Sequence, residues 1–146
     1  MKLLSWIVHA RRPLETTEVQ HALAIRPGAR GIYVKYLPEV EDMASDSAGL
    51  VIIDEESGTI RLVHFTTQDY FERTCAKWFP HANAYLAEAC GTYLSFDAFD
   101  AYDYWKGPDS GSNCEYPLYN YAANHVGYHA RESTSEAPIL SVVDFL

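Results

Sequence analysis

His64 stands where a predicted β-hairpin gives way to a predicted helix. Residues 50–53 form an unbroken apolar run and residues 59–65 alternate, which predicts two short strands joined by a polar turn that ends at Gly58. A helix is expected directly afterwards, and the unpaired N–H groups at a helix start attract anions. Because an imidazole N–H can donate a hydrogen bond to a phosphate oxygen, His64 is a candidate phosphate-binding residue.

The residues around His64 also allow a purely structural interpretation. Ile60 and Leu62 share its predicted strand face, so His64 could instead be a core histidine that hydrogen-bonds to the backbone. Thr66 and Asp69 match a capping box, in which two side chains satisfy N–H groups at the helix start. We expect this pair to cap the helix rather than to bind a ligand. The sequence leaves both roles of His64 open.

His125 and His129 have the spacing of two metal ligands on one face of a helix. Val126 stands where a zinc-protease motif has its glutamate, and the sequence offers no evident third ligand, so no metal site is predicted. A set of aspartates spaced by three lacks the alternating oxygen ligands and the glycine of a calcium loop. This set, interpreted as a solvated acidic turn, consists of Asp97, Asp100 and Asp103.

No catalytic residue is predicted. Cys75, Cys90 and Cys114 are 15 and 24 residues apart, which is typical of reduced thiols that pack in a core. The sequence has neither a G-x-S-x-G motif for a nucleophilic serine nor a G-x-x-x-x-G-K-[ST] loop that would cradle phosphates. The chain is therefore predicted to be neither an enzyme nor an NTPase.

The composition is that of a folded, acidic protein. With 146 residues, 48% of them hydrophobic, the chain can form one domain or two small ones that share a core. A net charge of −9 argues against nucleic acid and against an anionic membrane surface as partners. The apolar runs are too short for a membrane span or a signal peptide, and reduced cysteines favour a cytoplasmic location. Because the chain begins inside a predicted helix, we expect it to be a fragment of a longer protein.

The elements that must position His64 are mostly helices. The predicted fold class is mainly α with a small antiparallel β-hairpin, arranged as a winged helix-turn-helix followed by a helical bundle. Residues 1–75 are predicted to form the winged-helix domain, and residues 76–146 a helical extension packed on it. Hydrophobic periodicity and stop signals such as Pro13, Gly28 and Gly49 place helices near residues 3–10, 16–25, 38–48, 67–77, 82–94 and from 117 onward.

The third predicted helix is acidic on its exposed face, through Glu39, Asp42 and Asp46. In a DNA-binding winged helix this helix would read the bases, and the acids would repel the phosphate backbone. The turn of the predicted wing is acidic as well, at residues 54–56. DNA binding is therefore excluded as the main role, and the acidic face is either a solvated surface or a docking face for a basic partner.

A second candidate partner surface is aromatic and consists of Tyr102, Tyr104 and Trp105 in the loop before the last helix. Tyrosine and tryptophan are enriched in protein–protein interfaces. The alternative is that these rings pack onto the last helix.

Several short runs occur in an order that resembles a known family. They resemble the winged-helix region that follows the NACHT nucleotide-binding domain in fungal STAND NTPases, which are NLR-like and often carry ankyrin repeats. The region is similar to the GPI inositol-deacylase winged-helix domain. The runs include Leu3-Leu4-Ser5-Trp6-Ile7, Arg11-Arg12-Pro13-Leu14, Gln20-His21-Ala22-Leu23-Ala24, Ala48-Gly49-Leu50-Val51, Asp54-Glu55-Glu56-Ser57, Arg61-Leu62-Val63-His64-Phe65-Thr66-Thr67-Gln68-Asp69-Tyr70-Phe71, Trp78-Phe79-Pro80, Thr92-Tyr93-Leu94-Ser95-Phe96 and Tyr121-Ala122-Ala123-Asn124.

The resemblance implies a regulatory domain. In such proteins the winged helix packs on the nucleotide-binding domain and holds it closed around ADP, and the histidine at the end of the wing, here His64, reaches the β-phosphate. This chain alone would bind no cofactor; ADP or ATP would be bound through an NTPase domain that the chain lacks. The implied partners are that domain and a repeat domain of the same protein, with oligomers formed only by the full-length protein. The alternative function is a free-standing, acidic, tyrosine-rich interaction module without nucleotide contact.

Overall fold

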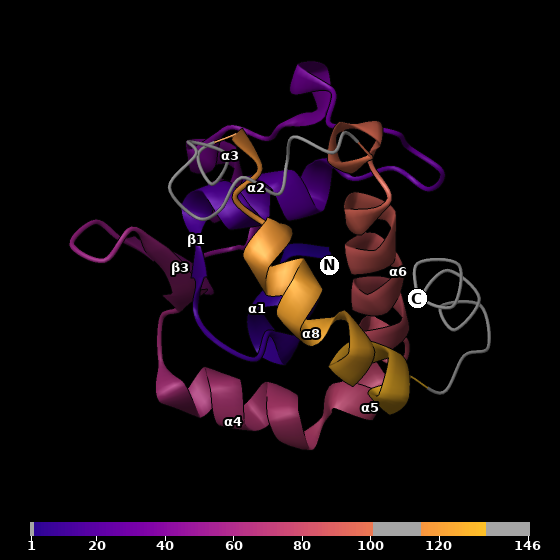
Figure 1. The fold of residues 1–146 in the computed structure, drawn as a ribbon. Coiled ribbons are helices and arrows are strands. Elements are labelled where there is room, and N and C mark those ends of the chain that lie inside the picture. Colours follow the sequence, from indigo (N-terminus) through magenta and orange to yellow (C-terminus); the bar gives the residue numbers. More distant parts are fainter. Residues whose placement is uncertain (1, 101–114, 134–146) are drawn as a thin grey trace.

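The computed structural model describes residues 2–100 and 115–133, and it confirms a mainly helical fold with a small antiparallel sheet. Figure 1 shows α1 near the centre, with α4 along the lower edge, α2 and α3 above, the β-hairpin projecting to the left, α6 on the right and α8 in front. The helices are α1 (Lys2–His9), α2 (Thr16–Ala24), α3 (Val40–Asp46), α4 (Phe65–Arg73), α5 (Cys75–Trp78), α6 (Ala82–Leu94) and α8 (Tyr119–Glu132). Short 3-10 turns are η1 (Val34–Tyr36) and η2 (Asp97–Phe99).

The sheet has three strands in the order β1-β3-β2, formed by β1 (Leu14–Glu15), β2 (Val51–Asp54) and β3 (Thr59–Leu62). The predicted hairpin is present, with Ile53 opposite Ile60, but the sequence analysis missed β1. Two residues are too few for a periodic pattern, and β1 becomes a strand because Leu14 is buried opposite Ile60. Gly58 adopts a φ of +67°, which places its carbonyl to accept a hydrogen bond from the Thr16 backbone N–H at 2.9 Å.

The helix after the hairpin begins earlier than predicted. Its N-cap residue is His64, and no side chain caps it, so the expected capping role of Thr66 and Asp69 is wrong. The predicted helix over residues 67–77 is also divided at Thr74, whose hydroxyl donates to the Tyr70 carbonyl at 2.7 Å. Such back-bonding by a threonine competes with the helical pattern and explains the break.

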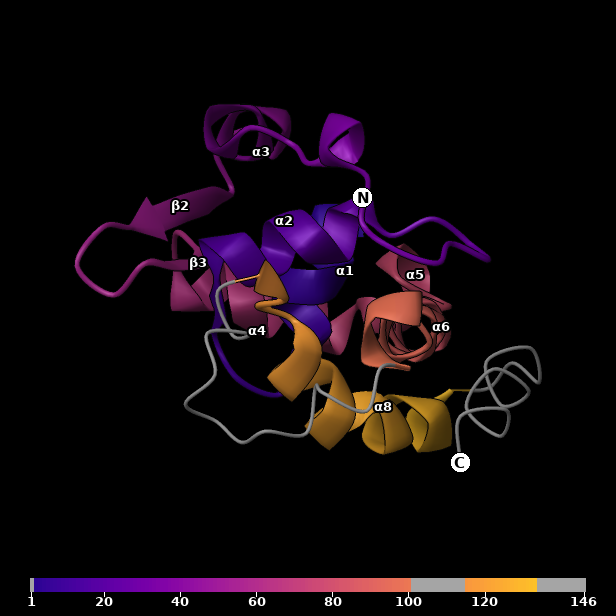
Figure 2. The ribbon, with the colours of Figure 1, turned by 45° about the horizontal axis from the view of Figure 1, so that its top comes forward.

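The helical extension shares one core with the winged-helix part. Helices α6 and α8 lie side by side in both views (Figures 1 and 2) and make the most extensive helix–helix contact of the described chain. Trp6 of α1 is fully buried between rings of these two helices, with ring centroids 6.2 Å from Tyr85 and 6.0 Å from Tyr121. The boundary predicted near residue 75 lies beside the break at Thr74, and the core continues across it.

The third helix contributes little to the core. Within α3 only Met43 is buried, and Figure 2 shows α3 on the side of the molecule opposite α8. The helix is followed by Ala48 and Gly49, which both adopt a positive φ. The positive φ of Gly49 therefore agrees with its predicted role in ending the helix. The acidic residues of α3 remain on a surface that contributes little to the core.

Candidate functional site

His64 lies on the surface, where β3 hands over to α4. His64 is exposed, and its imidazole makes no hydrogen bond with the described part of the chain. The backbone at His64 is extended, with φ −130° and ψ 144°, and the His64 carbonyl accepts a hydrogen bond from the Thr67 N–H at 3.1 Å. The side chain is therefore accessible beside the start of α4 and is not a core residue.

Exposure of His64 follows from where β3 ends. Ile60 and Leu62 point into the core as the alternating pattern predicted, but β3 stops at Leu62. His64 already belongs to the helix cap, so the period of two no longer applies to it. Thr66 and Asp69, predicted as the cap pair, are exposed on the first turns of α4. The structure thus brings His64 and Thr66 to one exposed helix start, without a capping interaction between side chains.

The acids predicted as a partner surface are exposed along α3. Glu39 is the N-cap residue of this helix, and Asp42 and Asp46 lie one turn apart on its surface. The turn of the hairpin is acidic too, and its Glu55 and Glu56 are exposed. The aromatic residues predicted as a partner surface, Tyr102, Tyr104 and Trp105, lie outside the described residues.

Of the two histidines with metal-ligand spacing, His129 is buried and already has partners for both ring nitrogens. The Tyr121 hydroxyl donates to its Nε2 at 2.8 Å, and its Nδ1–H donates to the Asn83 Oδ1 at 2.8 Å. Burial, together with a smaller contribution from the neighbouring His125, lowers the pKa of His129 to about 4. The neutral imidazole is therefore a structural link between α6 and α8.

The buried position of His129 was not predicted from the sequence. His125, one helical turn earlier, is half-buried and packs against the ring of Tyr121, with 4.6 Å between the ring centroids. Among the described residues, no group of three His, Cys, Asp or Glu side chains could hold a metal ion. Cys90 is buried and burial raises its thiol pKa, while Cys75 is half-buried.

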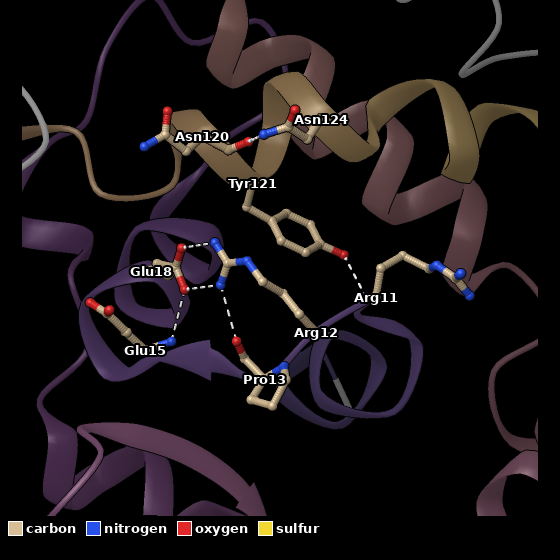
Figure 3. A network of polar contacts seen from close by, with 8 residues as sticks. All are labelled: Arg11, Arg12, Pro13, Glu15, Glu18, Asn120, Tyr121 and Asn124. Atoms are coloured by element: carbon tan, nitrogen blue, oxygen red, sulfur yellow. Dashed lines mark hydrogen bonds and ion pairs between the residues drawn. The ribbon is translucent and has the colours of Figure 1, made fainter. Parts of the chain in front are cut away.

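A polar network ties the chain between α1 and β1 to α2 and α8 (Figure 3). The Arg12 guanidinium donates to both carboxylate oxygens of Glu18, at 2.9 and 2.6 Å, and Glu18 is buried. Glu18 also accepts a hydrogen bond from the Glu15 N–H at 2.8 Å, within a capping box in which Glu15 is the N-cap residue of α2. From α8, the Tyr121 hydroxyl accepts the Arg11 N–H at 3.1 Å.

This network explains how the carboxylate of Glu18 can be buried. The paired hydrogen bonds raise the pKa of Arg12 and keep the buried carboxylate of Glu18 compensated. The guanidinium also lies over the ring of Tyr121, at 5.3 Å from the centroid. The segment that leads into β1 is thus held from both sides, next to the pairing of β1 with β3, the strand that precedes His64.

No helix in the described ranges combines the length and the apolar character that crossing a membrane requires.

Comparison with known proteins gives one match. The family of the GPI inositol-deacylase winged helix domain matches residues 1–77, just over half of the 146-residue chain, from α1 into α5. No curated protein and no solved structure matches the chain. A winged helix domain is typically non-catalytic. The order of α1, α2 and α3 followed by the β2–β3 wing agrees with this match, and the chain belongs to the GPI inositol-deacylase winged helix domain family.

Proposed function

We propose that this chain is a non-catalytic regulatory segment of a NACHT-type STAND signalling protein of the cytoplasm. In this role the winged helix packs on a nucleotide-binding domain of the same protein and helps to hold its ADP-bound closed state. A repeat domain, of the ankyrin type in fungal proteins of this kind, would release that state when it binds its ligand. The chain itself binds no cofactor, and ADP or ATP is bound by the neighbouring NTPase domain.

The observation that carries the proposal is the exposed imidazole of His64 at the start of α4. A residue that senses a phosphate held by another domain must project from the surface, and His64 does so with no competing hydrogen bond to the described residues. The adjacent helix start adds a favourable field for an anion. The family match over residues 1–77 supports the same role, because it includes the whole wing and His64.

The charge distribution supports a protein partner rather than DNA. Both elements that a winged helix would place on DNA, α3 and the hairpin turn, carry exposed acids. Bringing these carboxylates to a phosphate backbone would add repulsion and desolvation cost.

In the full-length protein, replacing His64 by alanine is expected to speed ADP release by about tenfold or more, because a hydrogen bond to a charged group contributes about 1.5–3 kcal/mol. The rate is measured by displacing a fluorescent ADP analogue from the purified protein. His64→Gln retains an N–H donor and should release ADP at an intermediate rate. Basal oligomerisation, followed by light scattering, should rise together with the release rate.

His81 provides the matched control. It is also an exposed histidine at the N-cap of a helix, α6, and no side chain caps that helix start either. His81→Ala should leave ADP release unchanged. Equal release rates for the His64→Ala variant and the unaltered protein would refute the sensor role, whereas equal acceleration by both variants would point to a general loss of helix stability.

A second candidate function is a free-standing interaction module that contacts no nucleotide. The exposed acids of α3 favour it, because they offer a docking face that does not depend on His64. The full reading frame separates the two functions: a P-loop upstream and ankyrin-type repeats downstream would support the regulatory segment, whereas stop codons in both places would support the free-standing module.

A further inference from the structure

A hollow lies beside α3, at the end of the core nearest the start of α1. Its volume is about 500 Å³, and Leu3, Leu4, Leu23, Met43 and Leu50 form most of its apolar lining. The walls come from α1, α2, α3 and the residues that precede β2. This surface is mostly hydrocarbon, although it opens to the outside of the described chain.

A second hollow of about 450 Å³ continues from the first, because Leu4 and Leu50 line both. Its other lining residues belong to α4 and α5 and include Tyr70 and Trp78. These rings are 44% and 41% exposed, and the Trp78 indole N–H donates to the Tyr70 hydroxyl at 3.2 Å. The two aromatic side chains are thus held together as an accessible wall. We call the two hollows together the α3–α4 groove.

The charges at the groove are asymmetric. Asp42 and Asp46 line it on the α3 side, and Glu39 and Glu41 extend the acidic edge along the same helix. Lys2 is the one cation among the described lining residues, and the α4–α5 side contributes only uncharged side chains. A ligand lying in the groove would therefore meet apolar surface below and carboxylates along one edge.

We propose that the α3–α4 groove binds an amphipathic helix of a partner protein, one that carries apolar side chains on one face and lysine or arginine beside them. Helices that dock in grooves use apolar anchors at i, i+3, i+4 and i+7. The walls of this groove are mostly helical, so a helix can pack its ridges between them. The acidic edge selects basic partners by charge complementarity. This inference does not rest on the nucleotide contact proposed for His64.

The test uses a synthetic peptide of about 16 residues, long enough to form helix when bound. It carries leucines at the anchor positions, lysines on the adjacent face and a fluorescent label, and its binding to the whole chain is followed by anisotropy. A matched peptide has glutamate in place of each lysine. The lysine peptide should bind at least tenfold more tightly than the glutamate peptide at low ionic strength.

Two pairs of charge reversals locate the binding site. Asp42→Lys with Asp46→Lys should weaken binding of the lysine peptide by about tenfold and strengthen binding of the glutamate peptide. The control, Glu55→Lys with Glu56→Lys, makes the same change in net charge on exposed residues of the hairpin turn and should change either affinity less than twofold. Equal effects of the two pairs would overturn the proposal, because they would show only general attraction.

The apolar part of the groove is tested separately. Trp78→Ala removes part of the aromatic wall and should weaken binding of the lysine peptide several-fold, whereas Val34→Ala, at an exposed apolar residue of η1, should leave it unchanged. Failure of both peptides to bind would overturn the proposal. Two other results would also overturn it. If sedimentation shows a dimer that Trp78→Ala disrupts, the groove binds a second copy of the chain. If Val142→Asp makes the peptide bind more tightly, the groove binds the chain's own residues 139–146.

Discussion

Replacing Trp6 by alanine is expected to lower the free energy of unfolding of the entire described fold by about 3–5 kcal/mol, the usual cost of removing a large buried ring. Trp6 is fully buried, its indole N–H donates to the Tyr85 hydroxyl at 3.3 Å, and its ring packs edge-on against Tyr121. These two partners belong to α6 and α8, outside the residues that match the family. The cavity would therefore weaken both halves of the chain together.

Urea unfolding followed by far-UV circular dichroism measures the loss in the free energy of unfolding, and hydrogen exchange shows which elements are destabilised. Amides of α1, α6 and α8 should lose protection together in Trp6→Ala. Trp78→Ala is the control, because Trp78 is largely at the surface and its removal should cost far less. Retained protection in α6 and α8 alongside loss in α1 would show that the two halves fold independently, against this prediction.

Lowering the pH from 7.5 to 5.0 is expected to destabilise the protein, and His129 should supply about 2 kcal/mol of the loss. Burial lowers the folded-state pKa of His129 to about 4, whereas the pKa of an unperturbed histidine is 6.5. Between these values the unfolded chain binds the proton and the folded chain does not, so stability rises with pH. The contribution is complete above pH 6.5, falls as the pH drops through 6.5, and levels off below about 4.

Urea unfolding at several pH values between 5.0 and 7.5 tests this dependence, with His129→Gln as the comparison. The variant should show a shallower slope, although some slope remains because burial also lowers the pKa of His9 and His21. An NMR titration of the His129 ring should show no protonation above pH 5. If the variant and the unaltered protein show the same slope, His129 does not control the acid sensitivity.

The sequence predicted the parts of the fold that are set by local pattern. The apolar period over α6, the glycine stops after α2 and α3, and the alternation of Ile60 and Leu62 all follow from residue spacing. The resemblance carried by the runs from Leu3 to Phe71 also identified the domain that the family match shows. The predicted hairpin-to-helix junction is present, although His64 is the N-cap residue of α4 and not a residue of β3.

The parts that could not be predicted depend on contacts between distant segments. Leu14 becomes a strand residue only because β3 lies beside it, and His129 is buried because Asn83 and Tyr121 offer partners 46 and 8 residues away. The start of α4 was predicted too late for two reasons. Thr66 and Asp69 match a capping box, and His64 continues the alternating pattern of the strand before it. The local sequence carries no signal that decides between these two helix starts.

The shared core has a mechanical consequence. α1 contacts α2, α4, α6 and β3, so it joins the hairpin side of the molecule to the α6–α8 pair. The buried ring of Trp6 packs against the half-buried ring of Tyr85 and the buried ring of Tyr121, so side-chain contacts cross the predicted domain boundary. We therefore expect a displacement of the wing to be transmitted through α1 to the α6–α8 pair.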